Sequence, residues 1–89
     1  MQRRTYLFSG NVQGVGFRYT ARHVAAGHQV TGYVRNLDDG RVELVMEGPK
    51  GEMDAVLDGI RDALGRNISR TACDASPATG EFKVFEVRH

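Results

Sequence analysis

The segment Gly10–Arg18 (GNVQGVGFR) contains residue types that together can bind an anion. Its glycines allow backbone conformations in which successive N–H groups point to one side, and a helix that follows would add the partial positive charge of its N-terminus. Arg18 closes the segment, and its guanidinium can donate to more than one oxygen of a single ligand. This combination suits a phosphoryl group with its three oxygens.

Two nucleotide-binding motifs use the same physics, and neither is present. The dinucleotide motif G-x-G-x-x-G fails because Tyr19 stands where the third glycine belongs. No glycine is followed by the Lys-Ser or Lys-Thr pair of the nucleoside-triphosphate loop. The segment is therefore either a cradle for a smaller anion or a tight turn whose arginine is a solvated surface charge. The residues alone leave both interpretations open.

Hydrophobic patterning predicts the elements that must position this segment. Four stretches are β-branched, apolar or alternating and are predicted strands, namely Thr5–Ser9, Val30–Asn36, Arg41–Glu47 and Glu81–Arg88. Apolar residues at helical spacing predict one helix from Phe17 to near Gly27 and another from about Met53 to near Gly65. Asp39-Gly40 predicts a tight hairpin turn, and the small, polar residues 66–80 predict a loop.

The element order is therefore βαββαβ. It predicts an α+β sandwich of ferredoxin-like topology, with one antiparallel sheet and both helices packed on a single face. We expect the first and third strands at the centre of the sheet, and Arg41, Glu43 and Glu47 on the face away from the helices. A chain of 89 residues has room for one core, so residues 1–89 are expected to form a single domain.

The composition limits the function classes. The formal net charge is +1, from 12 Lys and Arg against 11 Asp and Glu, without a long basic block, which argues against broad capture of nucleic acid. Cys73 is the only cysteine and the three histidines lack metal-ligand spacing, so no disulfide and no metal site is expected within the chain. No stretch approaches a membrane span or a secretory leader. We expect a cytoplasmic protein, by default a monomer, with no cofactor.

The chain resembles the acylphosphatase family in two motifs. The family motif G-x-V-Q-G-V-x-[FY]-R is matched at Gly10, Val12, Gln13, Gly14, Val15, Phe17 and Arg18. The family block G-[WY]-V-[RK]-N…DG-x-V-E…G is matched by Gly32–Asn36, Gly40–Glu43 and Gly48. Phe85–Arg88 is similar to the family's last strand, so the resemblance covers essentially the whole chain. One departure is Asn11, where the family often has a basic residue.

The resemblance implies an enzyme that hydrolyses carboxylic–phosphoric anhydrides to a carboxylate and inorganic phosphate, without metal or cofactor. Its substrates would be small acyl phosphates or phosphorylated carboxylates. Arg18 would be catalytic by holding the phosphoryl oxygens, and Asn36 by orienting the attacking water. The implied phosphate-binding residues are Val12, Gln13, Gly14, Val15, Gly16, Phe17 and Arg18. Taken alone, Asn36 is better explained as a turn-forming residue before Leu37, and only the two motifs together favour a role in catalysis.

Elementary chemistry agrees with this division. Phosphoryl transfer needs positioning and charge stabilisation more than covalent catalysis, and an acyl phosphate has a good leaving group. Asn36 cannot act as a base at neutral pH, but its amide can hydrogen-bond a water. The third strand is free to lie between the strands that lead to Arg18 and Asn36, so the curl of the loop must bring these residues together.

The alternative is a non-catalytic module of the same fold that binds acyl phosphates or regulates a partner. An RNA-binding module would need stacking aromatic residues, and the predicted strand Arg41–Glu47 has none. A metal carrier would need a Cys-x-x-Cys pair, which the single cysteine excludes.

Overall fold

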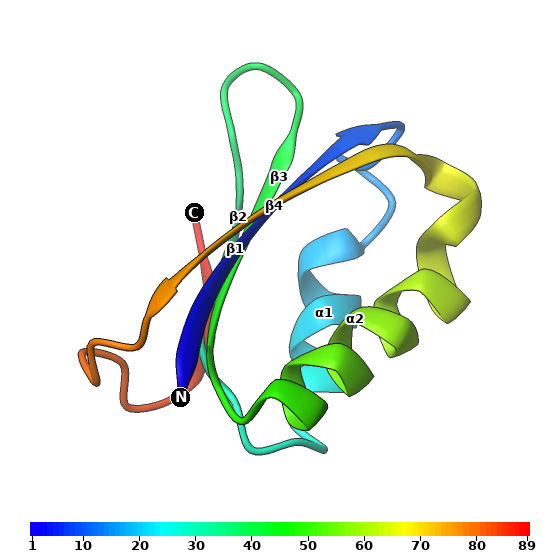
Figure 1. Ribbon diagram of the computed structural model, residues 1–89. Coiled ribbons are helices and arrows are strands. Elements are labelled where there is room, and N and C mark those ends of the chain that lie inside the picture. The colour runs from blue at the N-terminus through cyan, green and yellow to red at the C-terminus, as the bar shows by residue number, and fades with distance from the viewer.

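The computed structural model describes residues 1–89 as a five-stranded sheet with both helices on one face (Figure 1). In chain order the elements are β1 (Gln2–Gly10), α1 (Phe17–Ala25), β2 (Thr31–Asn36), β3 (Val42–Gly48), α2 (Lys50–Leu64), the 3-10 turn η1 (Gly65–Asn67), β4 (Ile68–Pro77) and β5 (Phe85–Arg88). The strand order is β4-β1-β3-β2-β5, so β1 and β3 lie inside the sheet as predicted. Neither helix is both long enough and apolar enough to span a lipid bilayer.

The sheet differs from the predicted one at both edges. Residues 66–80, predicted as a loop, contain β4, which pairs antiparallel with β1. As an edge strand, β4 exposes nearly all its side chains, so it lacks the apolar alternation by which strands are recognised. The predicted strand Glu81–Arg88 shortens to β5 and pairs in parallel with β2. The sheet is therefore mixed and has five strands, where the prediction was an antiparallel sheet of four.

The core lies between the sheet and the helices. Its largest fully buried side chains come from both layers and are Phe8, Val34, Val42, Leu44 and Met46 of the sheet, Val12 of the loop, and Phe17, Met53, Val56 and Ile60 of the helices. The rings of Phe8 and Phe17 pack with their centroids 5.1 Å apart. Because Phe8 is near the end of β1 and Phe17 begins α1, this contact fixes both ends of the glycine-rich loop.

The two helices approach each other closely at a glycine. A Cβ atom at Gly59 of α2 would lie 2.6 Å from Cγ1 of Val24 in α1. Glycine inside a helix is less favourable than alanine by about 1 kcal/mol. The close packing of α2 on Val24 accounts for a glycine at this position in spite of that penalty.

Glu47 faces away from the helices, as predicted, but it is buried, with only 5% of its surface exposed. The segment between β4 and β5 covers it. Its carboxylate accepts hydrogen bonds from the N–H groups of Thr79 and Gly80, and from Nε of Arg3 at 2.7 Å. Burial opposes ionisation, but these donors outweigh it and lower the pKa of Glu47 to about 2.

We expect Glu47→Gln to lower the free energy of unfolding at pH 7 by about 1–3 kcal/mol, because an amide cannot accept every hydrogen bond that the carboxylate accepts. The folded state depresses the pKa of Glu47, so the carboxylate stabilises fully above its ordinary pKa of 4.5, and this stabilisation is lost as the pH falls toward about 2. Urea unfolding curves of the two proteins should therefore converge at acidic pH. Glu86→Gln, at an exposed position of β5, is the control, and equal losses in both variants would contradict the assignment.

Gly59→Ala should destabilise the fold, whereas the same change in an open helix raises stability by about 1 kcal/mol. The added methyl group would overlap the stiff, β-branched side chain of Val24, and we expect a net loss of about 1 kcal/mol in urea unfolding. Val24→Ala in the same chain should relieve the overlap and give a favourable coupling energy. Gly51→Ala is the matched control in α2, where a Cβ meets nothing within 4 Å. A more stable Gly59→Ala variant would rule out the close packing.

Candidate active site

The loop between β1 and α1 takes its shape from two glycines. Gly14 and Gly16 have φ angles of 78° and 74°, in the left-handed region that side chains other than glycine rarely adopt. The space beside both residues is open, so the backbone conformation and not crowding favours glycine there. Gly16 is also the residue immediately before α1.

Apolar side chains hold this loop on the body of the protein. Val12 and Phe17 are buried in the core, and Val15 packs against it. Gly14 separates Val12 from Val15, and Gly16 separates Val15 from Phe17. The side chains therefore serve the core, and the backbone between them is left to face the surroundings.

The backbone N–H groups of residues 12–19 donate to no backbone acceptor. The first hydrogen bond of this region runs from the N–H of Thr20 to the carbonyl of Gly16, at 3.0 Å. No side chain caps the start of α1. The first turn of a helix always leaves N–H groups unpaired, and together with the helix dipole they favour a bound anion.

Gln13 ties the loop to the hairpin between β2 and β3. Its Nε2 donates to the carbonyl oxygens of Leu37, at 2.8 Å, and of Arg41, at 3.0 Å. The N–H of Leu37 donates to the same carbonyl of Arg41, so Gln13 binds where the hairpin closes. Because β3 lies between β1 and β2, the loop has to reach past β3, and these hydrogen bonds hold it there.

A pocket of about 250 Å³ lies where the loop, the start of α1 and the end of β2 meet. It is lined by Val12, Gly14, Gly16, Phe17, Arg18, Tyr19 and Asn36. Arg18 and Asn36 thus line one pocket although they come from different elements, and Arg18 is its only charged residue. Gln13 and Val15 do not line it, and their assignment to phosphate binding stays a prediction that concerns their backbone N–H groups.

Both predicted catalytic side chains have unused hydrogen-bonding capacity. Oδ1 of Asn36 is buried and has no hydrogen-bond partner, which is rare for a buried oxygen. Nη1 of Arg18 lies 3.3 Å from the carbonyl oxygen of Arg88 and 2.9 Å from Nδ1 of His89. The end of β5 therefore holds one side of the guanidinium, and its other nitrogens are available to a ligand.

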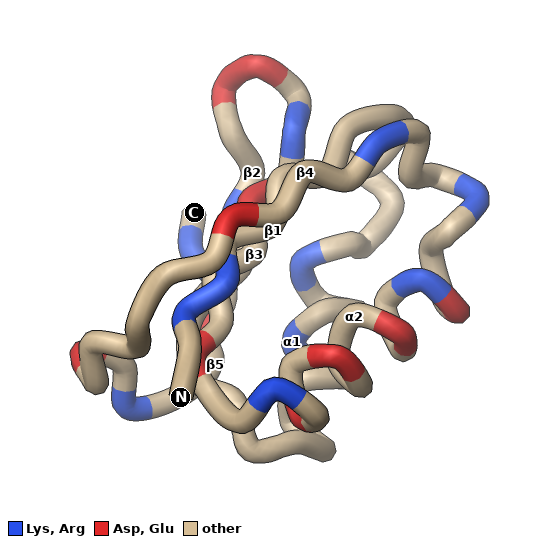
Figure 2. Tube along the Cα trace, viewed as in Figure 1, with Lys and Arg blue, Asp and Glu red and all other residues tan.

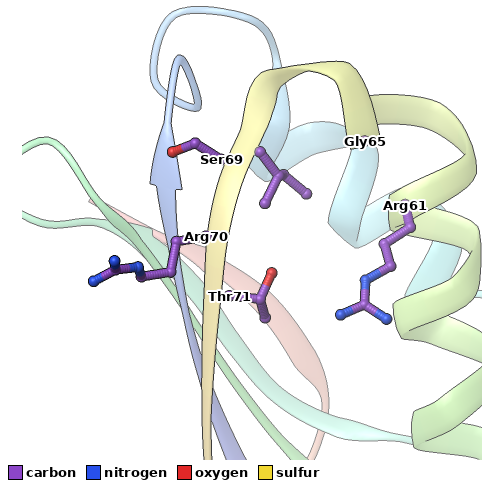
Figure 3. A pocket seen from close by; sticks show the side chains of 6 residues that line it. Arg61, Gly65, Ser69, Arg70 and Thr71 are labelled. Atoms are coloured by element: carbon purple, nitrogen blue, oxygen red, sulfur yellow. The ribbon is translucent and has the colours of Figure 1, made fainter.

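A second hollow, of about 410 Å³, lies between α2 and β4. In Figure 3, Arg61 and Thr71 point into the space between these elements, whereas Arg70 extends from the opposite side of β4. The two guanidinium groups do not converge, so this hollow is a poorer anion site than the loop pocket. No group of three or more His, Cys, Asp and Glu side chains is arranged to hold a metal ion.

Gln13→Glu should detach the loop from the hairpin without unfolding the protein, because a carboxylate cannot donate to the carbonyls of Leu37 and Arg41. We expect hydrogen exchange at the Leu37 amide to accelerate about five- to tenfold, the effect of losing roughly 1 kcal/mol of hydrogen bonding. Exchange within α2 should not change. Gln2→Glu, at an exposed position of β1, is the control, and unaltered exchange at Leu37 in Gln13→Glu would show that the contact contributes nothing.

Comparisons with known proteins point to one family. The family model described as acylphosphatase matches residues 4–87. An acylphosphatase of Haloarcula marismortui is 52% identical over 87 residues, which cover 96% of this chain and 94% of the relative, and one of Geobacillus kaustophilus is 45% identical over 100% and 96%. The crystal structure of acylphosphatase from Bacillus subtilis superposes over the whole of both chains with a TM-score of 0.89 at 26% identity.

Proposed function

Because the chain belongs to the acylphosphatase family, we propose that it hydrolyses acyl phosphates to a carboxylate and inorganic phosphate. The observation that carries this proposal is the single pocket lined by glycine-loop residues whose N–H groups are unpaired, by Arg18 and by Asn36. Its substrates would be small acyl phosphates or phosphorylated carboxylates. We expect it to act in the cytoplasm as a single-domain monomer.

In this mechanism the phosphoryl group binds in the loop pocket. The N–H groups between Val12 and Arg18 donate to its oxygens, and Arg18 donates through the nitrogens that Arg88 and His89 leave free. All of these groups are donors, so the pocket favours a ligand that is negatively charged. The donors are fixed before the substrate arrives, which is the condition under which they stabilise the charge that spreads over the phosphoryl oxygens in the transition state.

Asn36 would position the nucleophile. Its side-chain amide, through oxygen or nitrogen, would hydrogen-bond a water and so aim a lone pair of that water at phosphorus. As the new P–O bond forms, the bond between phosphorus and the carboxyl oxygen breaks, and the carboxylate leaves with the electron pair. No carboxylate or imidazole lines the pocket to act as a base, so one water proton passes to a phosphoryl oxygen. The products are a carboxylate and dihydrogen phosphate, and the charges balance.

The purified protein should hydrolyse benzoyl phosphate in the presence of a chelator, with inorganic phosphate as a competitive inhibitor. The measurement is the fall in benzoyl phosphate absorbance. Activity that appears only when a metal is added would overturn the metal-independent mechanism. Phosphate binding without any turnover would instead support the non-catalytic module.

Arg18→Ala should weaken phosphate inhibition and lower kcat/KM by about 10²- to 10³-fold. This corresponds to about 3–4 kcal/mol of transition-state stabilisation, the usual loss when one donor is removed from a preorganised site. Arg61→Ala is the matched control, since this arginine lines the hollow between α2 and β4. A similar fall in both variants would mean that Arg18 acts only through net charge.

Asn36→Ala should lower kcat and leave the phosphate inhibition constant nearly unchanged, because Asn36 is assigned to the water and not to the phosphoryl group. Asn67→Ala, in the turn η1, tests the effect of losing an asparagine elsewhere. Normal turnover of the Asn36→Ala enzyme would remove Asn36 from the mechanism.

A further inference from the structure

A groove of about 530 Å³ begins beside the loop pocket and lies between α1 and β5. Its lining consists of Tyr19 and Arg22 of α1 together with Val84, Phe85, Glu86, Val87 and His89. Tyr19 also lines the loop pocket, so the two hollows adjoin at this residue. Arg18 reaches the same place, since its Nη1 contacts His89, which lines the groove.

The groove is lined by apolar side chains that the fold leaves uncovered. Tyr19 and Val84 are 59% and 62% exposed and, with Met1, are the exposed large hydrophobic residues of the molecule. Phe85 and Val87 pack partly against the core and form the floor. Exposed apolar groups next to a polar site are typical of the part of a pocket that receives the non-reacting portion of a ligand.

One free cation lies beside this apolar floor. Arg22 follows Arg18 by one helical turn, which places the two Cβ atoms about 5–6 Å apart. Unlike Arg18, Arg22 has no hydrogen bond or ion pair through its side chain, and α1 carries basic but no acidic segments (Figure 2). The one acidic residue of the groove, Glu86, accepts a hydrogen bond from Arg88 at 3.1 Å, and the guanidinium of Arg88 lies over the Tyr33 ring.

Building on the proposed function, we propose that this groove binds the acyl part of the substrate and that Arg22, which lines the groove, binds a second anionic group. With the phosphoryl group at Arg18, the spacing of one helical turn fits a short aliphatic chain between the two charged groups. The preferred substrates are therefore short acyl phosphates that end in a carboxylate or another anion, and Arg22 is the residue that selects them.

Stable phosphonates test this inference without the chemical step. Butylphosphonate and 4-phosphonobutyrate have chains of equal length and differ in whether a methyl group or a carboxylate ends them. Titration calorimetry with both compounds and with inorganic phosphate gives their affinities. We expect the wild-type protein to bind 4-phosphonobutyrate about two- to fivefold more tightly than butylphosphonate, as for a solvent-accessible ion pair.

Arg22→Gln should bring this ratio close to one and leave the affinity for inorganic phosphate unchanged. Arg61→Gln, a matched arginine in the hollow between α2 and β4, should keep the wild-type ratio. Val84→Ser should weaken both phosphonates alike, because it removes apolar contact and no charge. A wild-type ratio near one, or a ratio that Arg22→Gln leaves intact, would overturn the assignment of Arg22.

The benzoyl phosphate assay separates this inference from the proposed function. If benzoyl phosphate is hydrolysed but both phosphonates bind equally, the groove assignment fails and the function stands. If the ratio depends on Arg22 but no acyl phosphate is hydrolysed, the subsite stands and the function fails. If neither phosphate nor the phosphonates bind, both proposals are wrong.

Discussion

The structure depends on one constraint, that the loop after β1 must meet the end of β2 although β3 separates these strands. Two contacts satisfy this constraint. The packing of Phe8 on Phe17 holds the loop's ends on the core, and Gln13 holds its middle on the hairpin through the carbonyls of Leu37 and Arg41. Without the second contact, nothing would hold the middle of the loop, and with it Arg18, beside Asn36 at the end of β2.

In the proposed site, the loop would let a chain of low net charge bind an anion. Its apolar side chains anchor it to the core, so the proposed binding groups are mainly backbone N–H groups that any sequence possesses. The sequence then has to supply glycines at the two left-handed positions and a single cation, Arg18. The need for only one cation is consistent with a formal net charge of +1. Figure 2 shows acidic and basic segments interspersed over the rest of the trace.

Several features were predictable because a local pattern encodes them. The alternation in β3, the spacing in α2 and the two family motifs led to the right layers and the right family, and both were confirmed. β4 was missed because an exposed edge strand has no apolar side to recognise, and the burial of Glu47 was missed because Thr79 and Gly80, distant in sequence, cover it. The groove was equally hidden, since Tyr19 and Val84 become neighbours only when β5 packs beside α1. The hydrogen bonds of the Gln13 side chain likewise need the folded hairpin to exist.

The hydrogen bonds from Arg18 to Arg88 and His89 connect residues about seventy positions apart, and β5 pairs in parallel with β2. Contacts of such long sequence separation form late and slow a folding reaction. During synthesis on the ribosome, α1 and the loop would emerge well before the strand that holds the guanidinium in place. The contacts that hold Arg18 are therefore among the last to form, because a nascent chain can make them only after Arg88 and His89 have left the exit tunnel.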